Sequence, residues 1–266
     1  MVTKPPTRYN DLTGKEWLQH SFSIWRDIRK TDDERSFKHP AMFPSALAEK
    51  IIKTYTCKND IVLDPFMGIG STIIAAYNQD RRAIGIDLSK EFVKLANLRL
   101  KGLNGALSDK EIEIINADAR FLKEYVKDQT IDLCLTSPPY WDILNMRRTA
   151  DGKRIKNYGK DKTNLGNIDN YEQFLSELIQ VFSAVYDVLK IGGHCVVVVM
   201  DIRKKDRFYP LHSDLAEKMK GVGFIFEDII IWDRQHEYNN MKPLGWPSVF
   251  RVNKVHEYVL IFRKRK

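Results

Sequence analysis

Little in the sequence points to a cross-linked, metal-bound or membrane-embedded protein. The 266 residues include only three cysteines, Cys57, Cys134 and Cys195, which are widely spaced and form no Cys-x-x-Cys pair. Neither a disulfide framework nor a zinc site is therefore expected. No apolar run approaches the roughly 20 residues that a membrane-spanning helix needs, and the first residues lack the apolar core of a signal peptide. We expect a cytoplasmic protein with neither a membrane nor a metal as partner.

Basic residues outnumber acidic ones. Lys and Arg number 43 against 35 Asp and Glu, which gives a net charge of +8. A basic surface suits a polyanionic partner such as nucleic acid, although charge alone does not specify one. The hydrophobic content of 43% is that of an ordinary globular chain and argues against disorder.

Apolar strands and amphipathic helices alternate from about residue 45 onward, which predicts a parallel sheet covered by helices on both faces. Two late strands, 229–232 and 258–262, have no helix between them and therefore predict an antiparallel hairpin that closes the sheet edge. The fold class is α/β, with a doubly wound, mostly parallel seven-stranded sheet and a C-terminal antiparallel hairpin. The expected strands are 61–63, 83–86, 111–115, 131–135, 195–200, 225–232 and 257–262, and the expected helices are 45–55, 71–78, 90–103, 121–126, 171–189 and 211–221.

This pattern divides the chain into an N-terminal extension, 1–38, which shows no regular periodicity, and a single catalytic domain, 39–266. Within the domain, Gly192-Gly193 is expected to end the helix at 171–189. Two irregular segments interrupt the domain: a basic loop at 142–170 and an insertion at 235–255 within the hairpin. Loops this long in a compact domain are usually functional.

A glycine loop joins the first predicted strand of the domain to a helix, in the sequence Asp-Pro-Phe-Met-Gly-Ile-Gly-Ser-Thr at 64–72. Glycines allow a sharp turn and a close approach of the backbone to a ligand, and open α/β sheets bind ligands at the carboxyl ends of their strands. The loop lacks both the third glycine of the dinucleotide fingerprint and the Gly-Lys-Ser/Thr of a phosphate loop. A cofactor with a pyrophosphate is therefore disfavoured.

The next two strands also end in carboxylates, at Asp87 and Asp118. An acidic residue about 20 residues after a glycine loop suits a ribose diol. The alternative is that these side chains cap the helices that follow them. A ligand with a ribose, an adenine and a cation but no phosphate fits this rim, and S-adenosylmethionine is such a ligand.

Ser137-Pro138-Pro139-Tyr140 follows the fourth predicted strand. Strands one and four are neighbours in a doubly wound sheet, so this segment should lie beside the glycine loop. An exocyclic amino nitrogen is a poor nucleophile, because its lone pair is delocalised into the ring. The Ser137 oxygen and the Pro138 carbonyl can accept its two hydrogens, the prolines fix the backbone, and Tyr140 can stack on a base rotated out of the duplex.

Both motifs resemble those of the amino-directed DNA methyltransferases, which transfer a methyl group from S-adenosylmethionine to cytosine N4 or adenine N6. The segment His39 to Pro44 resembles the one that precedes the cofactor motif in this family. The resemblance implies a Rossmann-like methyltransferase fold and catalytic roles for Ser137, Pro138, Pro139 and Tyr140. The cofactor-binding residues that it implies, together with the strand-end carboxylates and their neighbours, are His39, Pro40, Phe43, Pro44, Asp64, Pro65, Phe66, Gly68, Gly70, Ser71, Thr72, Asp87, Leu88, Asp118 and Ala119.

The residues narrow the reaction within this family. A carbon-5 cytosine methyltransferase needs a Pro-Cys nucleophile, and the chain contains no Pro-Cys. Serine before Pro-Pro is commoner in cytosine-N4 enzymes, so N4 methylation is the main expectation and N6-adenine methylation the alternative. A catalytically silent DNA-binding subunit is a third possibility, but such subunits usually lose one of the two motifs, and both are intact here.

The order of the motifs resembles a circular permutation, because the cofactor motif precedes the catalytic one. Only about 36 N-terminal residues are left over for target recognition. Readout of double-stranded DNA is therefore expected from little protein, from the basic loop, or from a homodimer or second chain. The expected DNA-binding residues are Trp141, Arg147, Arg148, Lys153 and Arg154.

Overall fold

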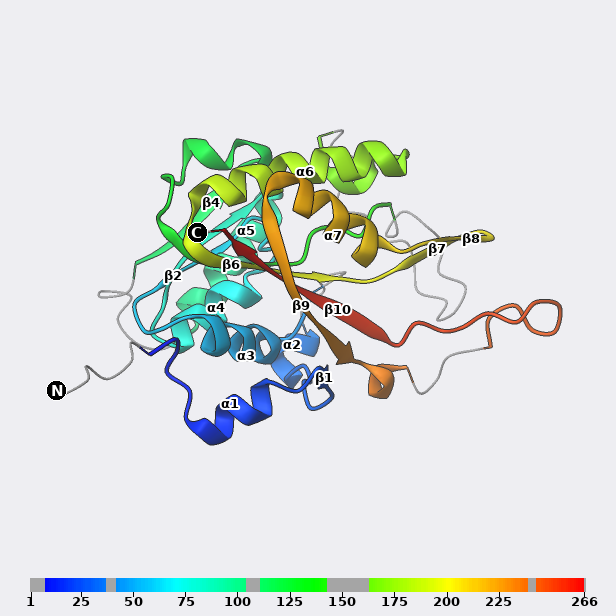
Figure 1. Ribbon diagram of the computed structural model, residues 1–266, viewed down its shortest axis with the longest axis horizontal. Helices are drawn as coiled ribbons and strands as arrows, with labels where there is room; N and C mark the ends of the chain where they lie inside the picture. Colours follow the sequence, from blue (N-terminus) through cyan, green and yellow to red (C-terminus); the bar gives the residue numbers. More distant parts are fainter. Residues whose placement is uncertain (1–7, 37–41, 104–110, 143–162, 239–242, 266) are drawn as a thin grey trace.

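The computed structural model describes residues 8–36, 42–103, 111–142, 163–238 and 243–265, and within these ranges the fold is built on one eight-stranded sheet (Figure 1). The order of the strands is β1-β9-β10-β6-β5-β2-β3-β4. The strands of this sheet are β1 (Ile24–Trp25), β2 (Ile61–Asp64), β3 (Arg82–Asp87), β4 (Ile112–Asn116), β5 (Ile131–Thr136), β6 (Leu189–Val199), β9 (Phe224–Asp233) and β10 (His256–Lys264). A separate two-stranded sheet pairs β7 (Ile202–Lys204) with β8 (Arg207–Tyr209).

Helices cover both faces of the large sheet (Figure 1). The α-helices are α1 (Gly14–His20), α2 (Asp32–Ser36), α3 (Ser45–Tyr55), α4 (Ser71–Asn78), α5 (Lys90–Lys101), α6 (Tyr171–Val188) and α7 (Leu211–Val222), and short 3₁₀ turns lie at η1 (Ala119–Glu124), η3 (Leu165–Asn167) and η4 (Gln235–Glu237). Side chains alternate across the sheet, so Val196 and Val198 pack in the α3–α4 core while Val197 and Val199 pack in the α6–α7 core. Central strands that are apolar at every position follow from this two-sided burial.

The structure confirms the α/β class and the seven strands expected from the sequence. It also confirms that β2 and β5 are neighbours, since Val62 pairs with Leu133 and Leu63 with Cys134. Strand β10 runs antiparallel to β9, as predicted. It also pairs antiparallel with β6, so the hairpin is inserted into the sheet and does not simply close its edge.

Two expectations about local structure were wrong. Helix α6 ends at Val188 and β6 begins at once at Leu189, so Gly192 and Gly193 lie inside the strand and do not end the helix. The segment 1–38 was expected to be irregular, yet its described part contains α1, β1 and α2.

The eighth strand, β1, comes from this N-terminal segment. It pairs in parallel with β9, Trp25 beside Trp232, and two residues are too few to show a strand period. Helix α1 did carry a signal, because Thr13 and Glu16 form a capping box. None of the helices in the described ranges is long and apolar enough to cross a bilayer.

Candidate active site

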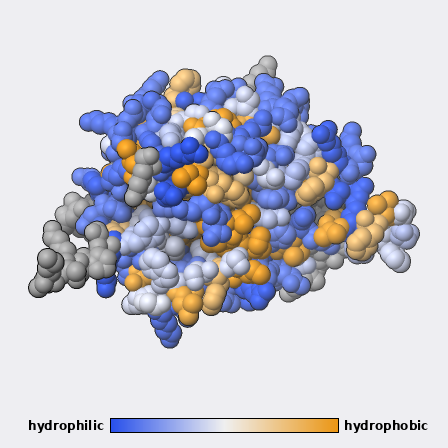
Figure 2. Space-filling model, in the orientation of Figure 1, coloured by the Kyte–Doolittle hydropathy of each residue, from blue (hydrophilic) through white to orange (hydrophobic). Residues whose placement is uncertain are grey.

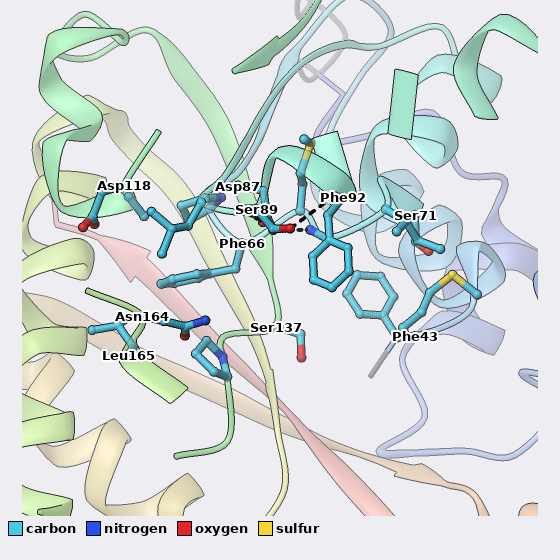
Figure 3. Close-up of a pocket in the computed structure, with 18 of the residues that line it drawn as sticks. Phe43, Phe66, Ser71, Asp87, Ser89, Phe92, Asp118, Ser137, Asn164 and Leu165 are labelled. Atoms are coloured by element: carbon cyan, nitrogen blue, oxygen red, sulfur yellow. Dashed lines mark hydrogen bonds between the residues drawn. The ribbon is translucent and has the colours of Figure 1, made fainter. Parts of the chain in front are cut away.

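A cavity of about 200 Å³ lies at the carboxyl ends of β2, β3 and β5 (Figure 3). Eleven residues predicted from the sequence line it: Phe43, Pro65, Phe66, Gly68, Ser71, Asp87, Leu88, Asp118, Ala119, Ser137 and Pro139. The rings of Phe43 and Phe92 lie on one side of the cavity, and Asn164 and Leu165 lie on the other (Figure 3). The glycine loop and the Ser-Pro-Pro-Tyr segment therefore face a single pocket.

The glycine loop turns directly from β2 into α4. Gly70, the residue before the helix, has a φ of 84°, a region that disfavours side chains. A Cβ on Gly70 would lie 3.2 Å from the Cβ of Ala96 in α5. Glycine at this position therefore gives the loop its left-handed turn and lets α5 pack closely against it.

Asp64 lies behind the loop and is 1% exposed. Its carboxylate accepts hydrogen bonds from the Thr72 hydroxyl at 2.6 Å, the Thr136 hydroxyl at 2.6 Å and the Phe66 amide at 3.0 Å. Burial raises the pKa of Asp64 to about 6, against the opposing effect of these donors. The carboxylate ties the glycine loop, α4 and β5 together, and a direct cofactor contact by Asp64 stays a prediction.

Asp87 lies at the rim of the pocket. Its two oxygens accept the amides of Gly68 and Ser89, each at 2.8 Å. Burial raises the pKa of Asp87 to about 7, and the two amide hydrogen bonds oppose that shift only in part. Helix α5 is capped by Ser89, so Asp87 does not serve as the helix cap that the alternative interpretation required.

Asp118 combines both expected roles. Its side chain accepts the Arg120 amide at 3.0 Å and so caps η1, while it also lines the pocket. The Arg120 guanidinium binds the same carboxylate at 2.6 Å and Glu177 at 2.6 Å. Asp118 therefore faces the pocket as a carboxylate whose charge is largely compensated.

The Ser-Pro-Pro-Tyr segment is held by a hydrogen-bond chain that reaches β10. The Ser137 and Tyr140 hydroxyl oxygens are 3.0 Å apart, and the Tyr140 hydroxyl donates to Glu257 Oε2 at 2.8 Å. Arg234 at the end of β9 forms an ion pair with Glu257. Burial, with the Glu257 charge as the second cause, raises the pKa of Tyr140 well above its usual value. The Tyr140 hydroxyl therefore stays protonated at neutral pH.

Trp141 lies in the protein core, and only 4% of it is exposed. Its backbone has a positive φ of 51°, and its indole donates to the Ile168 carbonyl at 2.7 Å. The ring packs edge-on against Tyr171 and Tyr209, with centroid distances of 5.1 and 4.9 Å. A DNA contact by Trp141 stays a prediction, and in this conformation the side chain anchors the segment that follows Tyr140.

Six predicted residues lie outside the described ranges: His39, Pro40, Arg147, Arg148, Lys153 and Arg154. Sequence reasoning missed several residues of the site, among them Met42, Phe92 and Asn164 in the pocket wall and the Arg234–Glu257 pair beneath it. Phe92 lies in the first turn of α5, which begins three residues after Asp87. A helix was expected at this rim, so the position of Phe92 was an available signal. Glu257 and Tyr140 are far apart in the sequence and come into contact only when the sheet forms, so no local pattern revealed that contact.

The pocket brings together the glycine loop, the strand-end carboxylates and Ser137, and comparison with known proteins gives the family. Residues 3–98 and 131–266 match the DNA methylase family, which comprises N6- and N4-directed enzymes. The chain belongs to this family, whose methyl donor is S-adenosylmethionine.

Two curated relatives show how far the similarity reaches. The orphan methyltransferase M.BamHII of Bacillus amyloliquefaciens is 45% identical over 84 residues, which cover 30% of this chain and 32% of the relative. The type II methyltransferase M.MjaI of Methanocaldococcus jannaschii is 30% identical over 171 residues, 58% of this chain and 56% of the relative. The matched part thus spans about a third to a little over half of these relatives.

One solved structure supports the fold. A SAM-dependent methyltransferase from Methanosarcina mazei superposes with a TM-score of 0.51 at 16% identity, covering 81% of this chain and 97% of that one. The Thermus thermophilus protein TTHA0409 in complex with S-adenosyl-L-methionine shares 28% identity over 56% of this chain and 52% of its own, with a TM-score of 0.39.

Proposed function

We propose that this chain methylates the exocyclic amino group of a base that is rotated out of double-stranded DNA, with cytosine N4 as the favoured target. One observation carries the proposal. The carboxylate-and-glycine rim that suits S-adenosylmethionine lines the same cavity as Ser137 and Pro139, which belong to the segment that suits an amino group. Methyl transfer needs its two reactants side by side, and positioning supplies much of its rate enhancement.

The pocket residues fit S-adenosylmethionine by their chemistry. Each Asp87 oxygen accepts one backbone amide and keeps lone-pair capacity for a ribose hydroxyl. Phe43, Phe66 and Phe92 supply apolar surface for an adenine ring. Bound there, the cofactor supplies a methyl group on a positively charged sulfur, which is activated for transfer to nitrogen.

The catalytic wall acts on the nitrogen nucleophile. Ser137 Oγ and the Pro138 carbonyl accept the two amino hydrogens, which localises the lone pair on nitrogen and turns it toward the methyl group. Tyr140 packs against the face of the base. The new bond joins nitrogen to the methyl carbon as the carbon–sulfur bond breaks, and one amino proton leaves to solvent.

Serine before the two prolines supports cytosine N4 as the target, and adenine N6 is the alternative. The relatives above are named as an orphan methyltransferase and a type II methyltransferase, and we extend site-specific modification of DNA to this chain. Recognition of the target sequence would then come from projecting segments of this chain, from a second copy or from a partner chain.

The test uses the purified chain, unmethylated plasmid DNA and methyl-labelled S-adenosylmethionine. We expect label in DNA, and mass spectrometry of the digested nucleosides should show N4-methylcytosine. N6-methyladenine would select the alternative base. Binding of S-adenosylmethionine in a calorimeter without any methyl incorporation into DNA would overturn the activity and favour the silent DNA-binding subunit.

A further inference from the structure

We propose that a projecting arm, made of residues 243–255 and the β7–β8 hairpin (202–209), binds duplex DNA beside the target base. The inference rests on the proposed function and assigns it a DNA-contacting surface outside the pocket. Figure 1 shows the 243–255 segment and the hairpin side by side, extending together from the body of the protein.

The arm starts at the active site. Arg234 before the segment and Glu257 after it form an ion pair, and Glu257 accepts the Tyr140 hydroxyl. The β7–β8 hairpin is joined to the same place, since Lys204 pairs with Asp142 and lies 4.1 Å from the centre of the Trp141 ring. An extended chain rises about 3.3 Å per residue, so the seven residues from Glu257 to Phe250 reach at most about 23 Å from the pocket. That reach matches the span of a few base pairs next to the target.

The tip of the arm is apolar and exposed. Trp246 is 79% exposed, Val249 51% and Phe250 94%, and Figure 2 shows apolar side chains at the projecting end of the molecule. The tip has a defined shape, because the amides of Ser248 and Val249 both donate to the Gly245 carbonyl, at 2.9 and 2.7 Å. A contiguous exposed apolar surface marks an interaction site.

The stem of the arm is basic, which selects DNA as the partner. The segment and the hairpin together carry six basic residues and one acidic residue, Asp206; the basic ones are Arg203, Lys204, Lys205, Arg207, Arg251 and Lys254. Arg251 donates to the Lys205 carbonyl at 3.0 Å, and Lys254 lies 5.0 Å from the Phe208 ring, so the segment and the hairpin present their charge together. Basic side chains bind phosphates, and an apolar tip can enter a groove or wedge between neighbouring base pairs.

The stem and the tip make separable contributions in a DNA-binding titration at several salt concentrations. Arg207→Ala and Arg251→Ala should each lower the salt slope by about one unit, because each removes a phosphate contact. Trp246→Ala with Phe250→Ala should weaken binding by about tenfold or more with an unchanged slope, because apolar contacts release no counterions. Trp17→Ala, an exposed tryptophan on α1, and Lys58→Ala, an exposed lysine before β2, are matched controls that should leave both quantities unchanged.

The proposal is overturned if the parent protein binds and methylates DNA and all the arm variants keep the wild-type affinity and salt slope. If the parent does neither, the proposed function fails and not the arm alone. Sedimentation provides a second criterion. A concentration-dependent dimer that the Trp246→Ala, Phe250→Ala protein cannot form would assign the tip to a second copy of the chain and overturn the DNA assignment.

A second inference follows from the direction of the hydrogen bonds beneath the pocket. We infer that Glu257 is a positioning residue that makes Ser137 an acceptor. A carboxylate can only accept, so the single Tyr140 proton is committed to Glu257 Oε2. The Tyr140 oxygen must then accept from the Ser137 hydroxyl, 3.0 Å away.

The consequence reaches the substrate. With its proton directed at Tyr140, Ser137 presents only lone pairs to the cavity that it lines. Pro138 and Pro139 have no backbone N–H, so they add no donor to this wall. The wall thus favours the amino edge of cytosine or adenine over the carbonyl edge of thymine or guanine.

The test is a double-mutant cycle on methyl transfer. The amide introduced by Glu257→Gln can donate to Tyr140, which allows the hydrogen bonds between these side chains to reverse direction. In this variant kcat should therefore fall about tenfold, with the Kd for S-adenosylmethionine unchanged. In a Tyr140→Phe background the link is already broken, so Glu257→Gln should cost nothing further. An equal loss in both backgrounds would mean a merely structural role and overturn the inference. If Glu257→Gln does not fold, Tyr140→Phe decides the question, because wild-type kcat in that variant also refutes it.

Discussion

The rim carboxylate Asp87 gives the sharpest quantitative test of the cofactor site. Asp87→Ala removes the carboxylate that we propose accepts the two ribose hydroxyls. A hydrogen bond to a charged group contributes about 1.5–3 kcal/mol, so two contribute at least about 3 kcal/mol, which corresponds to a loss of affinity of roughly 100-fold. Titration calorimetry with S-adenosylmethionine measures this loss directly.

The raised pKa of Asp87 makes the same interaction depend on pH. Burial sets this pKa at about 7 in the protein without ligand, and a protonated carboxyl offers fewer acceptors to the ribose. Affinity for S-adenosylmethionine should therefore fall as the pH drops below about 7, by up to about tenfold per unit. Asp87→Asn should flatten this dependence. Two other carboxylates lie nearby: Asp118, held by Arg120, and Asp64, whose pKa of about 6 places its titration lower.

The stability of the protein without ligand should change with pH in the opposite direction to the cofactor affinity. The folded protein holds the Asp87 proton up to about pH 7, whereas the unfolded chain loses it near pH 4. The folded state thus binds more protons in this window, and its stability contribution is lost as the pH rises from about 4 to 7. Melting curves of the parent and Asp87→Asn across this range report the difference.

The control is another carboxylate that accepts a backbone amide. Asp132, at the opposite end of the sheet, accepts the Ile61 amide at 2.9 Å and Lys190 Nζ at 2.6 Å. Asp132→Ala should lower stability and leave the affinity for S-adenosylmethionine intact. Unchanged affinity in Asp87→Ala, or the same pH dependence in Asp87→Asn as in the parent, would refute the ribose assignment.

Three further predictions concern the catalytic wall, the loop scaffold and the basic loop. Ser137→Ala should raise the activation free energy by on the order of 2 kcal/mol, which lowers kcat about 30-fold, while calorimetry shows cofactor affinity unchanged. Wild-type turnover would show that Ser137 takes no part in the reaction. Thr136→Val should cost about 1–3 kcal/mol of unfolding free energy in urea, because it takes a donor from the buried Asp64, whereas Thr130→Val at an exposed hydrogen bond should cost little; equal losses would contradict the scaffold role. Replacing Arg147, Arg148, Lys153 and Arg154 with alanine should weaken DNA binding at all sequences and flatten its salt dependence, and an unchanged slope would exclude phosphate contacts by these residues.

The sequence predicted the central fold because its signals there are local. The run Cys195 to Val199 is apolar at every position and is buried on both faces, which is typical of a central strand. Strand β1 gave no such signal, since its two residues are too few to show a strand period and their place is fixed by register with β9. The Gly192-Gly193 pair misled for a related reason. The pairing of β6 with β5 shifts register between Leu189 and His194, so the two glycines occupy an irregular stretch of the strand where a positive φ at Gly192 is accommodated.

The candidate site likewise contains residues that local signals predicted and residues that they did not. The glycine loop, Asp87 and Ser137 are each at the end of a strand, so the topology alone places them together. Asn164 and Glu257 reach the site from segments distant in sequence, through the returning loop after β5 and through the antiparallel insertion of β10. Their roles depend on tertiary register, which no single segment encodes.

The fold also explains why the order of the two motifs matters little to the site and much to DNA recognition. Strands β2 and β5 are adjacent whichever comes first in the chain, so both motif orders build the same pocket. Two of the described N-terminal elements lie away from the pocket, since β1 extends the sheet beyond β9 and α1 packs against α3. Among the described segments, the β7–β8 hairpin and residues 243–255 between β9 and β10 project into solvent (Figure 1). Readout of the target sequence by this chain should therefore follow substitutions in the arm, and not substitutions in α1 or β1.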